Sequence, residues 1–511
     1  MEISQNNIGY FPQMPICDKA SVVELNSDFS LPDYQPEIRR LLSSRAIVLP
    51  QHEYISNGNA EISGEINYKI TYLGADGGLY STLLSDTYSC SSSLNFNSHS
   101  VNNDDITLLP SIKTESVNTR VLGPRKLNVR AKLNCKIAAF APSLYAPNLV
   151  GAHSKATIEN RIFEKSTINT KRSENKTFVL NDTISFDSSN DSIRIIDCSS
   201  NVAVNECVPS IDKIQVRGDV VVKILYCNDT ESTHPQITTR KIPFSCELSC
   251  VGVNSLFECF VNGVCYDEKF DFEDNAIGLK LTLSLSAHAQ RNEAVKYVAD
   301  AYSTEKLCEC STSEITVLNA VRAAHGNLTQ NDVFSLENIK LSQDSKIIDI
   351  VGNCNIFELE TEGGKCIFKG NNEYQLIYFL DGEYASLSLN SPVKYELENR
   401  AKIDFEKPIK WFANGEISSV KARHDGEKLY VDSELNFNVN LVCEDKIDLL
   451  DEMIFSEFLN KSNSEIVLCY PDKNATIWSV AKEYGTPQKA IKLKNSIPEN
   501  EEIVKHRFLV I

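Results

Sequence analysis

A motif that occurs three times along the 511 residues is the feature that most constrains what this chain can fold into. Three segments align without gaps around a glycine and a tyrosine that follows it by eight positions. They are GEINYKITYLGADGG from Gly64, GDVVVKILYCNDT from Gly218 and GNNEYQLIYFLDGE from Gly370, with the tyrosines at Tyr72, Tyr226 and Tyr378. The glycines stand 154 and 152 residues apart (218 − 64 and 370 − 218). Two nearly equal intervals indicate a tandem array of three related units.

The residues around each tyrosine alternate between apolar and polar. A period of two is typical of a half-buried β-strand, and the acidic, glycine-containing turns that follow are typical of hairpins. A second alternating block closes each unit: KLNVRAKLNCKIAAF from Lys126, GLKLTLSLSAHA from Gly278 and KLYVDSELNFNVNLV from Lys428. Strands of this kind need a second sheet to cover their apolar face. We therefore predict a mainly β fold of three tandem antiparallel units, sandwich-like or barrel-like, at residues 15–147, 171–292 and 310–446.

A proline-containing segment, LPDYQPEIRRLLSSRAIV, opens the first unit. Pro36 suits the first position of a helix, and Ile38, Leu41 and Leu42 form a short apolar stripe at helical spacing. We predict a short helix here that caps the end of the unit. The later units keep only a weak form of this segment, at residues 192–196 and 345–348.

Charge and apolar patterning narrow the classes of partner. The net charge is −18 and the chain has no basic run, so we expect neither nucleic acid nor an anionic membrane surface as a partner. No apolar run reaches the roughly 18 residues of a transmembrane helix. The beginning MEISQNNIGYFPQMPICDKA lacks the basic and apolar regions of a secretory signal. We therefore expect a protein that stays where it is made, with most of its 16 cysteines as free thiols.

Motifs for catalysis and for metal or cofactor binding are missing from the sequence. The chain has no GxSxG, no HExxH and no GxxxxGK[ST] phosphate loop. Its 8 histidines are scattered, and it has no CxxC pair at zinc-site spacing. We expect no enzymatic activity, no metal and no cofactor.

The character of the sequence changes after Asp445. We expect an acidic linker at residues 447–464 and a separate small module at residues 465–511. The module has the pattern strand, helix, helix, strand. Thr476 suits the N-cap of the first helix, and Gly485 suits the left-handed turn at its end.

This module resembles a LysM domain in the run TIWSVAKEYG and in the asparagine at Asn495. The LysM family folds as a βααβ unit and usually binds N-acetylglucosamine-containing glycans in a groove between two loops. Two positions depart from the family pattern: Asn474-Ala475 replaces Gly-Asp, and His506 replaces a glycine. Because both positions flank the sugar groove, the resemblance implies a module that binds a protein rather than a peptidoglycan-type glycan.

We predict that the module is the main docking site of the chain. Residues 465–511 carry seven Lys or Arg and six acidic residues, a net charge of +1, which leaves −19 on the remainder (−18 − 1). An acidic protein surface would therefore be attracted to the module. Trp478 lies on the flank of the predicted helix, where it is either a contact anchor or part of the small core. The residues expected to bind the partner are Ile466, Thr476, Trp478, Lys489, Lys492, Lys494 and Asn495.

With this module in place, the three upstream units resemble SPOCS domains. The resemblance rests on the segment LPDYQPEI, the glycine–tyrosine hairpin and the closing alternating strand. SPOCS repeats followed by LysM are typical of the SipL-type family of spore-coat morphogenesis proteins of clostridia. The family implies a non-enzymatic scaffold in the mother-cell cytoplasm, at the forespore surface. There it would bind a morphogenetic ATPase of the coat basement through LysM and other coat proteins through the repeats. The alternative is a peptidoglycan-binding cell-wall or surface protein, which the altered sugar loops and the lack of a signal sequence disfavour.

Overall fold

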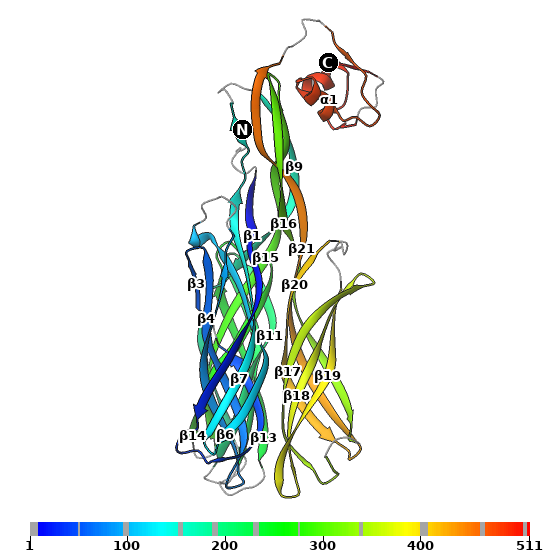
Figure 1. The fold of residues 1–511 in the computed structure, drawn as a ribbon. Helices are drawn as coiled ribbons and strands as arrows, with labels where there is room; N and C mark the ends of the chain where they lie inside the picture. The colour runs from blue at the N-terminus through cyan, green and yellow to red at the C-terminus, as the bar shows by residue number, and fades with distance from the viewer. Residues whose placement is uncertain are drawn as a thin grey trace.

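The computed structural model is mainly β, with antiparallel sheets and, among the residues that it describes, two short α-helices (Figure 1). The prediction of a mainly β, antiparallel fold is confirmed. Within the described residues one strand pair is parallel, between β8 (Asn148–Val150) and β21. The structure describes residues 9–49, 52–95, 102–151, 157–185, 193–227, 235–273, 276–336, 341–398, 407–459, 466–503 and 508–511.

The first unit consists of two sheets. One has the order β2-β4-β5, with the short β3 also paired to β4, and the other has the order β1-β7-β6. The first strand of the unit therefore pairs with its last strand, and the described strands form two separate sheets rather than a closed barrel. The strands are β1 (Tyr10–Ser30), β2 (Ile38–Val48), β3 (His52–Ser56), β4 (Asn59–Gly74), β5 (Leu79–Ser93), β6 (Thr107–Gly123) and β7 (Lys126–Leu144), with a 3-10 turn at Asn103–Asp105.

The same strand order recurs twice more along the chain. The second unit has the sheets β11-β12-β13 and β10-β15-β14, and the third has β17-β18-β19 and β16-β21-β20. The second set is β10 (Lys176–Ser185), β11 (Arg194–Ser210), β12 (Lys213–Cys227), β13 (Gln236–Ser249), β14 (Glu258–Glu273) and β15 (Ala276–Ser303). The third set is β16 (Lys306–Ser335), β17 (Lys346–Glu362), β18 (Lys365–Leu380), β19 (Glu383–Glu398), β20 (Ile409–His424) and β21 (Lys428–Phe458).

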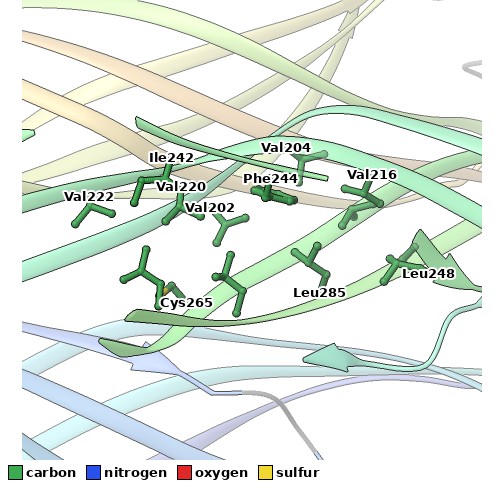
Figure 2. Close-up of a cluster of buried hydrophobic side chains, with 14 of the residues drawn as sticks. Val202, Val204, Val216, Val220, Val222, Ile242, Phe244, Leu248, Cys265 and Leu285 are labelled. Carbon is green, nitrogen blue, oxygen red and sulfur yellow. The ribbon is translucent and has the colours of Figure 1, made fainter. Parts of the chain in front are cut away.

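Each unit encloses a hydrophobic core between its two sheets. In the second unit, Val216, Val220 and Val222 of β12 and Leu285 of β15 belong to one buried cluster (Figure 2). The alternating leucines of β15, from Leu279 to Leu285, are at most 2% exposed. Full burial of a side chain of this size stabilises the fold by about 1.5–3 kcal/mol. The apolar residues that alternate in the sequence therefore form the face through which the two sheets pack together.

In every unit, the tyrosine of the repeated motif lies in a strand that has a neighbouring strand on each side: β4, β12 or β18. All three tyrosines are buried. Each lies opposite an equivalent residue of the preceding strand, so the motif marks the same register three times. The pairs are Leu41–Tyr72, Ile195–Tyr226 and Ile347–Tyr378.

The motif glycines of the second and third units are required by a close approach of the neighbouring strand. A β-bulge lies opposite Gly218 in β11 and opposite Gly370 in β17. A side chain at Gly218 would collide with the backbone oxygen of Ala203, and one at Gly370 with that of Asn355. Glycine is the residue that leaves room for a bulged partner strand at such a position.

The prediction of a helix after Pro36 is wrong, because β2 begins at Ile38. The pairing of β2 with β4 contains register shifts beside Ile38 and Leu41. Each bulge adds one residue to the strand and shifts the alternation of its side chains. Ile38 and Leu41 consequently pack on the core of the unit, while Leu42 faces outward into a second cluster. The resulting spacing imitates that of a helix.

The three units meet around a shared apolar cluster. Leu42, Ile196 and Ile348 occupy the equivalent bulge of β2, β11 and β17, and all three belong to this cluster. The contacts between units run in a circle, with β5 against β11, β13 against β17, and β19 against β2. The bulge thus directs one apolar side chain out of each unit toward the other two.

The segments expected to link the units extend the strands instead. β9 (Ile158–Arg172) pairs with the end of β15, and the beginning of β16 pairs with the end of β21. These strand ends form a stalk that rises from the body in Figure 1. The predicted linker at 447–464 is strand as far as Phe458, and residues 460–465 lie outside the described part. A bulge opposite Thr312 breaks the alternation here, so the segment resembles an amphipathic helix in sequence.

The C-terminal module has the predicted order of strand, helix, helix and strand. It lies at the tip of the stalk (Figure 1). Its elements are β22 (Leu468–Cys469), α1 (Ile477–Glu483), α2 (Gln488–Lys494) and β23 (Leu509–Val510), with β22 antiparallel to β23.

Candidate docking module and buried polar contacts

Two of the predicted partner-binding residues make contacts inside the module. The hydroxyl of Thr476 accepts from the backbone N–H of Ser479 at 3.0 Å, and the Ser479 hydroxyl accepts from the Thr476 N–H at 3.0 Å. This reciprocal pair caps α1. The Asn495 amide donates to the carbonyl oxygens of Ile491 and Val510 at 2.8 and 2.7 Å, and accepts from the Val510 N–H at 2.8 Å. Asn495 therefore ties the end of α2 to β23.

Trp478 lies between the module and the stalk. Its side chain is 6% exposed and belongs to the core of the module, with Ile477 and Ile491. The indole packs edge-on against Tyr302 of β15, with ring centroids 5.0 Å apart. Its Nε1–H donates to the Asp300 carboxylate at 2.8 Å. Of the two roles considered for Trp478, the side chain thus occupies the one in a core, and that core extends to the stalk.

Two further hydrogen bonds attach the module to the same strand. Lys482 of α1 donates to the second oxygen of Asp300 at 2.6 Å. The Tyr302 hydroxyl donates to the backbone oxygen of Thr486 at 2.9 Å. Asp300 therefore accepts from both Trp478 and Lys482, and it is the central polar contact between stalk and module.

The other predicted docking residues lie nearer the surface. Ile466 is 67% exposed, and Lys489 and Lys494 are exposed as well. Two lysines donate to backbone carbonyls within the module, at 2.5 Å for Lys492 and 2.9 Å for Lys494. Lys489 and Ile466 are consequently the members of the predicted set with the most surface to offer a partner.

An apolar face on the two-stranded sheet was not singled out from the sequence. Leu468, Tyr470 and Phe508 are 50%, 69% and 49% exposed, whereas Cys469 and Leu509 between them are buried. The rings of Tyr470 and Phe508 lie 6.3 Å apart. Strands of two residues are too short for alternation to reveal which face is outward, so the sequence carried no signal for this face.

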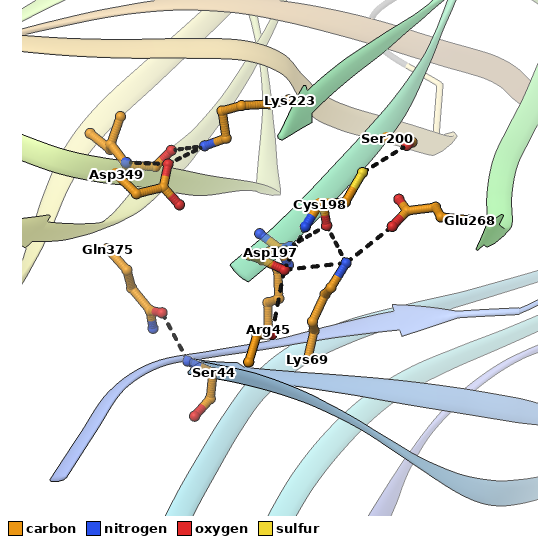
Figure 3. Close-up of polar contacts among 12 residues, drawn as sticks. Ser44, Arg45, Lys69, Asp197, Cys198, Ser200, Lys223, Glu268, Asp349 and Gln375 are labelled. Atoms are coloured by element: carbon orange, nitrogen blue, oxygen red, sulfur yellow. Dashed lines mark hydrogen bonds and ion pairs between the residues drawn. The ribbon is translucent and has the colours of Figure 1, made fainter. Parts of the chain in front are cut away.

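Buried ion pairs connect consecutive units (Figure 3). Lys69 of β4 pairs with Asp197 of β11 at 3.3 Å, and Lys223 of β12 pairs with Asp349 of β17 at 2.6 Å. Each lysine also donates to the backbone oxygen of the residue that follows its aspartate. Both lysines stand three positions before the motif tyrosine, and both aspartates directly follow the bulge. The same two positions therefore connect the first unit to the second and the second to the third.

Where the third unit meets the first, the position equivalent to these lysine–aspartate pairs is neutral. Gln375 of β18 occupies the position of the lysine in the third unit, and Ser43 occupies that of the aspartate in the first. The Gln375 side-chain oxygen accepts from the backbone N–H of Ser44 at 3.1 Å (Figure 3). Two junctions thus carry a buried ion pair at this position. The third carries a hydrogen bond there, with an exposed ion pair between Arg39 of β2 and Glu383 of β19 at 2.5 Å.

Asp197 is the most heavily engaged carboxylate of this circle. Its side chain is 6% exposed, and Arg45 of β2 donates to it at 2.8 Å. Lys69 is shared between Asp197 and Glu268 of β14. Burial alone would raise the pKa of Asp197, but the cations Arg45, Lys69 and Lys223 outweigh burial and hold that pKa below its ordinary value. The carboxylate is therefore ionised and holds two cations of the first unit against the second.

A polar cavity of about 210 Å³ lies where the three units meet. Lys113 of β6, Asn262 of β14 and Glu416 of β20 line it from equivalent positions of the three units. Burial lowers the pKa of Lys113 to about 8 and raises the pKa of Glu416 to about 7. Glu416 lies directly opposite Asn436, whose amide nitrogen is buried without a hydrogen-bond partner among the described residues. The centre of the body is therefore polar and sensitive to pH.

Replacing Glu416 with glutamine is expected to stabilise the protein at pH 8 but not at pH 5. A carboxyl group whose folded pKa is raised contributes stability below its unfolded pKa of about 4.3, and loses it as the pH rises through about 7. Glutamine has no such loss, so the variant should exceed the wild type by on the order of 1–3 kcal/mol at pH 8. Thermal unfolding of both proteins at the two pH values measures the difference. An equal shift at both pH values would contradict the raised pKa.

The sheets and buried contacts define the class of this protein. It is a mainly β chain of three units with the same strand order, and one sheet of each unit contributes to a shared apolar cluster. A small module of two helices and two strands packs on the stalk. Residues 191–272, which span β11, β12, β13 and most of β14, match the family described as SipL, SPOCS domain. No curated protein and no solved structure matches the chain.

Membrane and metal features were sought in the described part of the chain. No helix in those residues is long and apolar enough to cross a membrane. No group of three or more His, Cys, Asp or Glu side chains in the same residues is arranged to hold a metal ion.

Proposed function

We propose that this protein is a non-enzymatic scaffold in spore coat assembly, in the mother-cell cytoplasm at the forespore surface. The observation that carries the proposal is the match of residues 191–272 to the SipL, SPOCS domain family. The other two units have the same strand order as the matched one, which supports three tandem SPOCS domains rather than one. The shared apolar cluster and the buried ion pairs hold the three units as a single body, as a scaffold needs.

The C-terminal module, in this proposal, is a LysM domain that docks onto a morphogenetic ATPase of the coat basement, while the SPOCS units contact other coat proteins. Its order of strand, helix, helix and strand supports the LysM assignment. So do the capped start of α1 at Thr476 and the clamp at Asn495. The module is also the part of the chain that does not share the acidic charge of the body.

The surface proposed for docking combines the exposed apolar face of the two-stranded sheet with an exposed cation of α2. Leu468, Tyr470 and Phe508, together with Ile466, supply apolar and aromatic area, and aromatic anchors carry much of the affinity at interfaces. Lys489 supplies charge that attracts an acidic partner. Trp478 supports this surface from inside the core and does not touch the partner.

The double variant Tyr470→Ala/Lys489→Glu is expected to weaken capture of the purified coat-basement ATPase by the full-length protein at least about 10-fold. Loss of an aromatic anchor alone commonly costs about 2 kcal/mol of binding free energy. Affinity is measured by titration of the ATPase onto immobilised protein, and circular dichroism confirms that the variant is folded. Lys421→Glu, at an exposed lysine of β20 in the third unit, is the matched control and should bind like the wild type.

Two outcomes would contradict the proposal. Undiminished capture by the folded double variant would place the docking surface elsewhere. Retention of the wild-type protein on peptidoglycan sacculi, together with failure to capture the ATPase, would favour a wall-binding function.

A further inference from the structure

Two cysteines and a histidine from three different strands lie together at the junction of the second and third units. The Cys259 thiol of β14 donates a hydrogen bond to the Cys207 sulfur of β11, with the sulfur atoms 3.2 Å apart. The Nδ1 atom of His325, in β16 of the third unit, lies 3.8 Å from the Cys207 sulfur. The three residues are far apart in sequence, so only the fold reveals the cluster.

The tautomer of His325 is set by its second ring nitrogen. Nε2 lies 3.1 Å from the backbone oxygen of Asn205, and a carbonyl oxygen can only accept, so Nε2 carries a hydrogen. Neutral His325 therefore presents the lone pair of Nδ1 to the Cys207 thiol and can take its proton. A thiol beside such an acceptor is poised to form the thiolate, which is the reactive species.

The groups around Cys207 have opposing effects on its pKa. The hydrogen bond from Cys259 and the proximity of His325 lower the pKa of Cys207, whereas burial and the Glu206 carboxylate oppose them. The net pKa of Cys207 lies below its ordinary value. Correspondingly, the hydrogen bond with Cys207 raises the pKa of His325, and the pKa of Cys259 is raised because it serves as the donor.

We propose that Cys207 and Cys259 form a redox-active dithiol, which hydrogen peroxide converts into an intramolecular disulfide with the assistance of His325. The Cys207 thiolate attacks one oxygen of the peroxide, an S–O bond forms and the O–O bond breaks. The departing hydroxide takes the proton held by His325 and leaves as water. The Cys259 sulfur then attacks the Cys207 sulfenic acid, the S–O bond breaks, and the hydroxyl leaves as water with the Cys259 proton. Two thiols lose two electrons in total, and one peroxide is reduced to two waters.

The position of the cluster determines what the disulfide would do. β11 belongs to one sheet of the second unit and β14 to the other. A Cys207–Cys259 bridge therefore crosslinks the two sheets of that unit. It also removes the thiol that faces His325 of the third unit, so oxidation is sensed at a junction between units.

The chain provides an internal control in a second pair of neighbouring thiols. Cys90 and Cys135 of the first unit hydrogen-bond to each other, and both are buried. The ionisable groups that act on Cys90 are Cys135 and Glu61, so the pair has the second thiol but a carboxylate in place of an imidazole. Cys246, which is half-buried as Cys207 is, controls for access of the oxidant.

The test exposes the full-length reduced protein to equimolar hydrogen peroxide at pH 7 and follows each thiol by alkylation and peptide mass spectrometry. A Cys207–Cys259 disulfide should form at least about 10-fold faster than a Cys90–Cys135 disulfide or oxidation of Cys246. This factor follows because an ordinary thiol of pKa about 8.5 is only a few per cent thiolate at pH 7. The Cys259→Ser variant should instead accumulate a sulfenic acid at Cys207, detectable with dimedone.

The His325→Gln variant isolates the role of the imidazole, because glutamine can still hydrogen-bond but cannot hold the proton. Cys207 oxidation at pH 7 should slow by about 10-fold in this variant and recover as the pH approaches 9. Unchanged thermal unfolding shows that the variant is folded. Oxidation of Cys207 at the rate of Cys246, or oxidation that is indifferent to His325, would overturn the proposal.

Discussion

Replacing Asp197 with alanine is expected to lower the stability of the body by about 3–5 kcal/mol, because it removes one partner of a buried charge cluster. The Asp197 side chain is 6% exposed and accepts from both Arg45 and Lys69. Without it, Lys69 keeps Glu268 as a counter-ion, but the half-buried Arg45 keeps only the hydrogen bond to the Cys198 carbonyl. The cost of leaving such a cation unpaired exceeds the net worth of the original pair.

The matched control is Gln375→Ala, at the equivalent but neutral position where the third unit meets the first. It removes one hydrogen bond, to the Ser44 backbone, and should cost only about 1 kcal/mol. Thermal unfolding at pH 7 and hydrogen exchange in β2, β4 and β11 report the two effects. Equal losses for the two variants would show that the Asp197 ion pairs stabilise the body no more than the Gln375 hydrogen bond does.

The pH dependence gives an independent check on Asp197. Its folded pKa lies below its ordinary value, so its contribution is complete above the unfolded pKa of about 3.9. The contribution is lost as the pH falls through the still lower folded pKa. The difference in stability between wild type and Asp197→Ala should therefore be constant from pH 5 to 7 and shrink only in stronger acid.

The strands were accessible to sequence reasoning because alternation is a local signal. The alternating leucines from Leu279 to Leu285 indicate the buried face of β15, and the motif tyrosines indicate the register of the central strands. The bulges were not accessible. A bulge changes the period by one residue, so Leu41 and Leu42 suggested a helix in β2, and the end of β21 was predicted to be an acidic linker.

The contacts between units could not be predicted from the sequence, for a different reason. Lys69 and Asp197 lie in different strands of different units, and nothing in a single sequence pairs them. The repeat nevertheless contained a clue, because Lys223 and Asp349 occupy the same two positions. Comparison of charges between aligned units, rather than within one unit, would have found it.

The family match also distinguishes the features that all three units share from a segment that only the first unit has. The match falls on the second unit, which lacks the LPDYQP segment of the first. The features that it shares with the other two units are the bulged strand, the glycine of the central strand and the strand order. These geometrical features, and not the two prolines, are what the three units have in common.

Replacing Trp478 with alanine is expected to unfold the C-terminal module and to abolish its docking. Loss of a buried tryptophan costs about 3–5 kcal/mol. A module of about 47 residues has little stability to spare, because a domain of that size buries a small core. Trp478 is 6% exposed and connects that core to Tyr302 of the stalk. Hydrogen exchange in α1 and α2 should become fast, and capture of the ATPase should be lost with it.

The variant Asp300→Ala separates unfolding of the module from its release. Asp300 accepts from Trp478 and Lys482 but lies on the stalk, outside the module's own core. Its loss should therefore loosen the attachment of the module, which Tyr302 still contacts through Trp478 and Thr486, while α1 and α2 stay protected from exchange. Because the proposed docking face at Tyr470 and Phe508 is already exposed, capture should remain at the wild-type level. Capture that increases on release would instead mean that the stalk covers part of the docking surface. A Trp478→Ala module that stays protected but no longer captures the partner would make Trp478 itself the anchor.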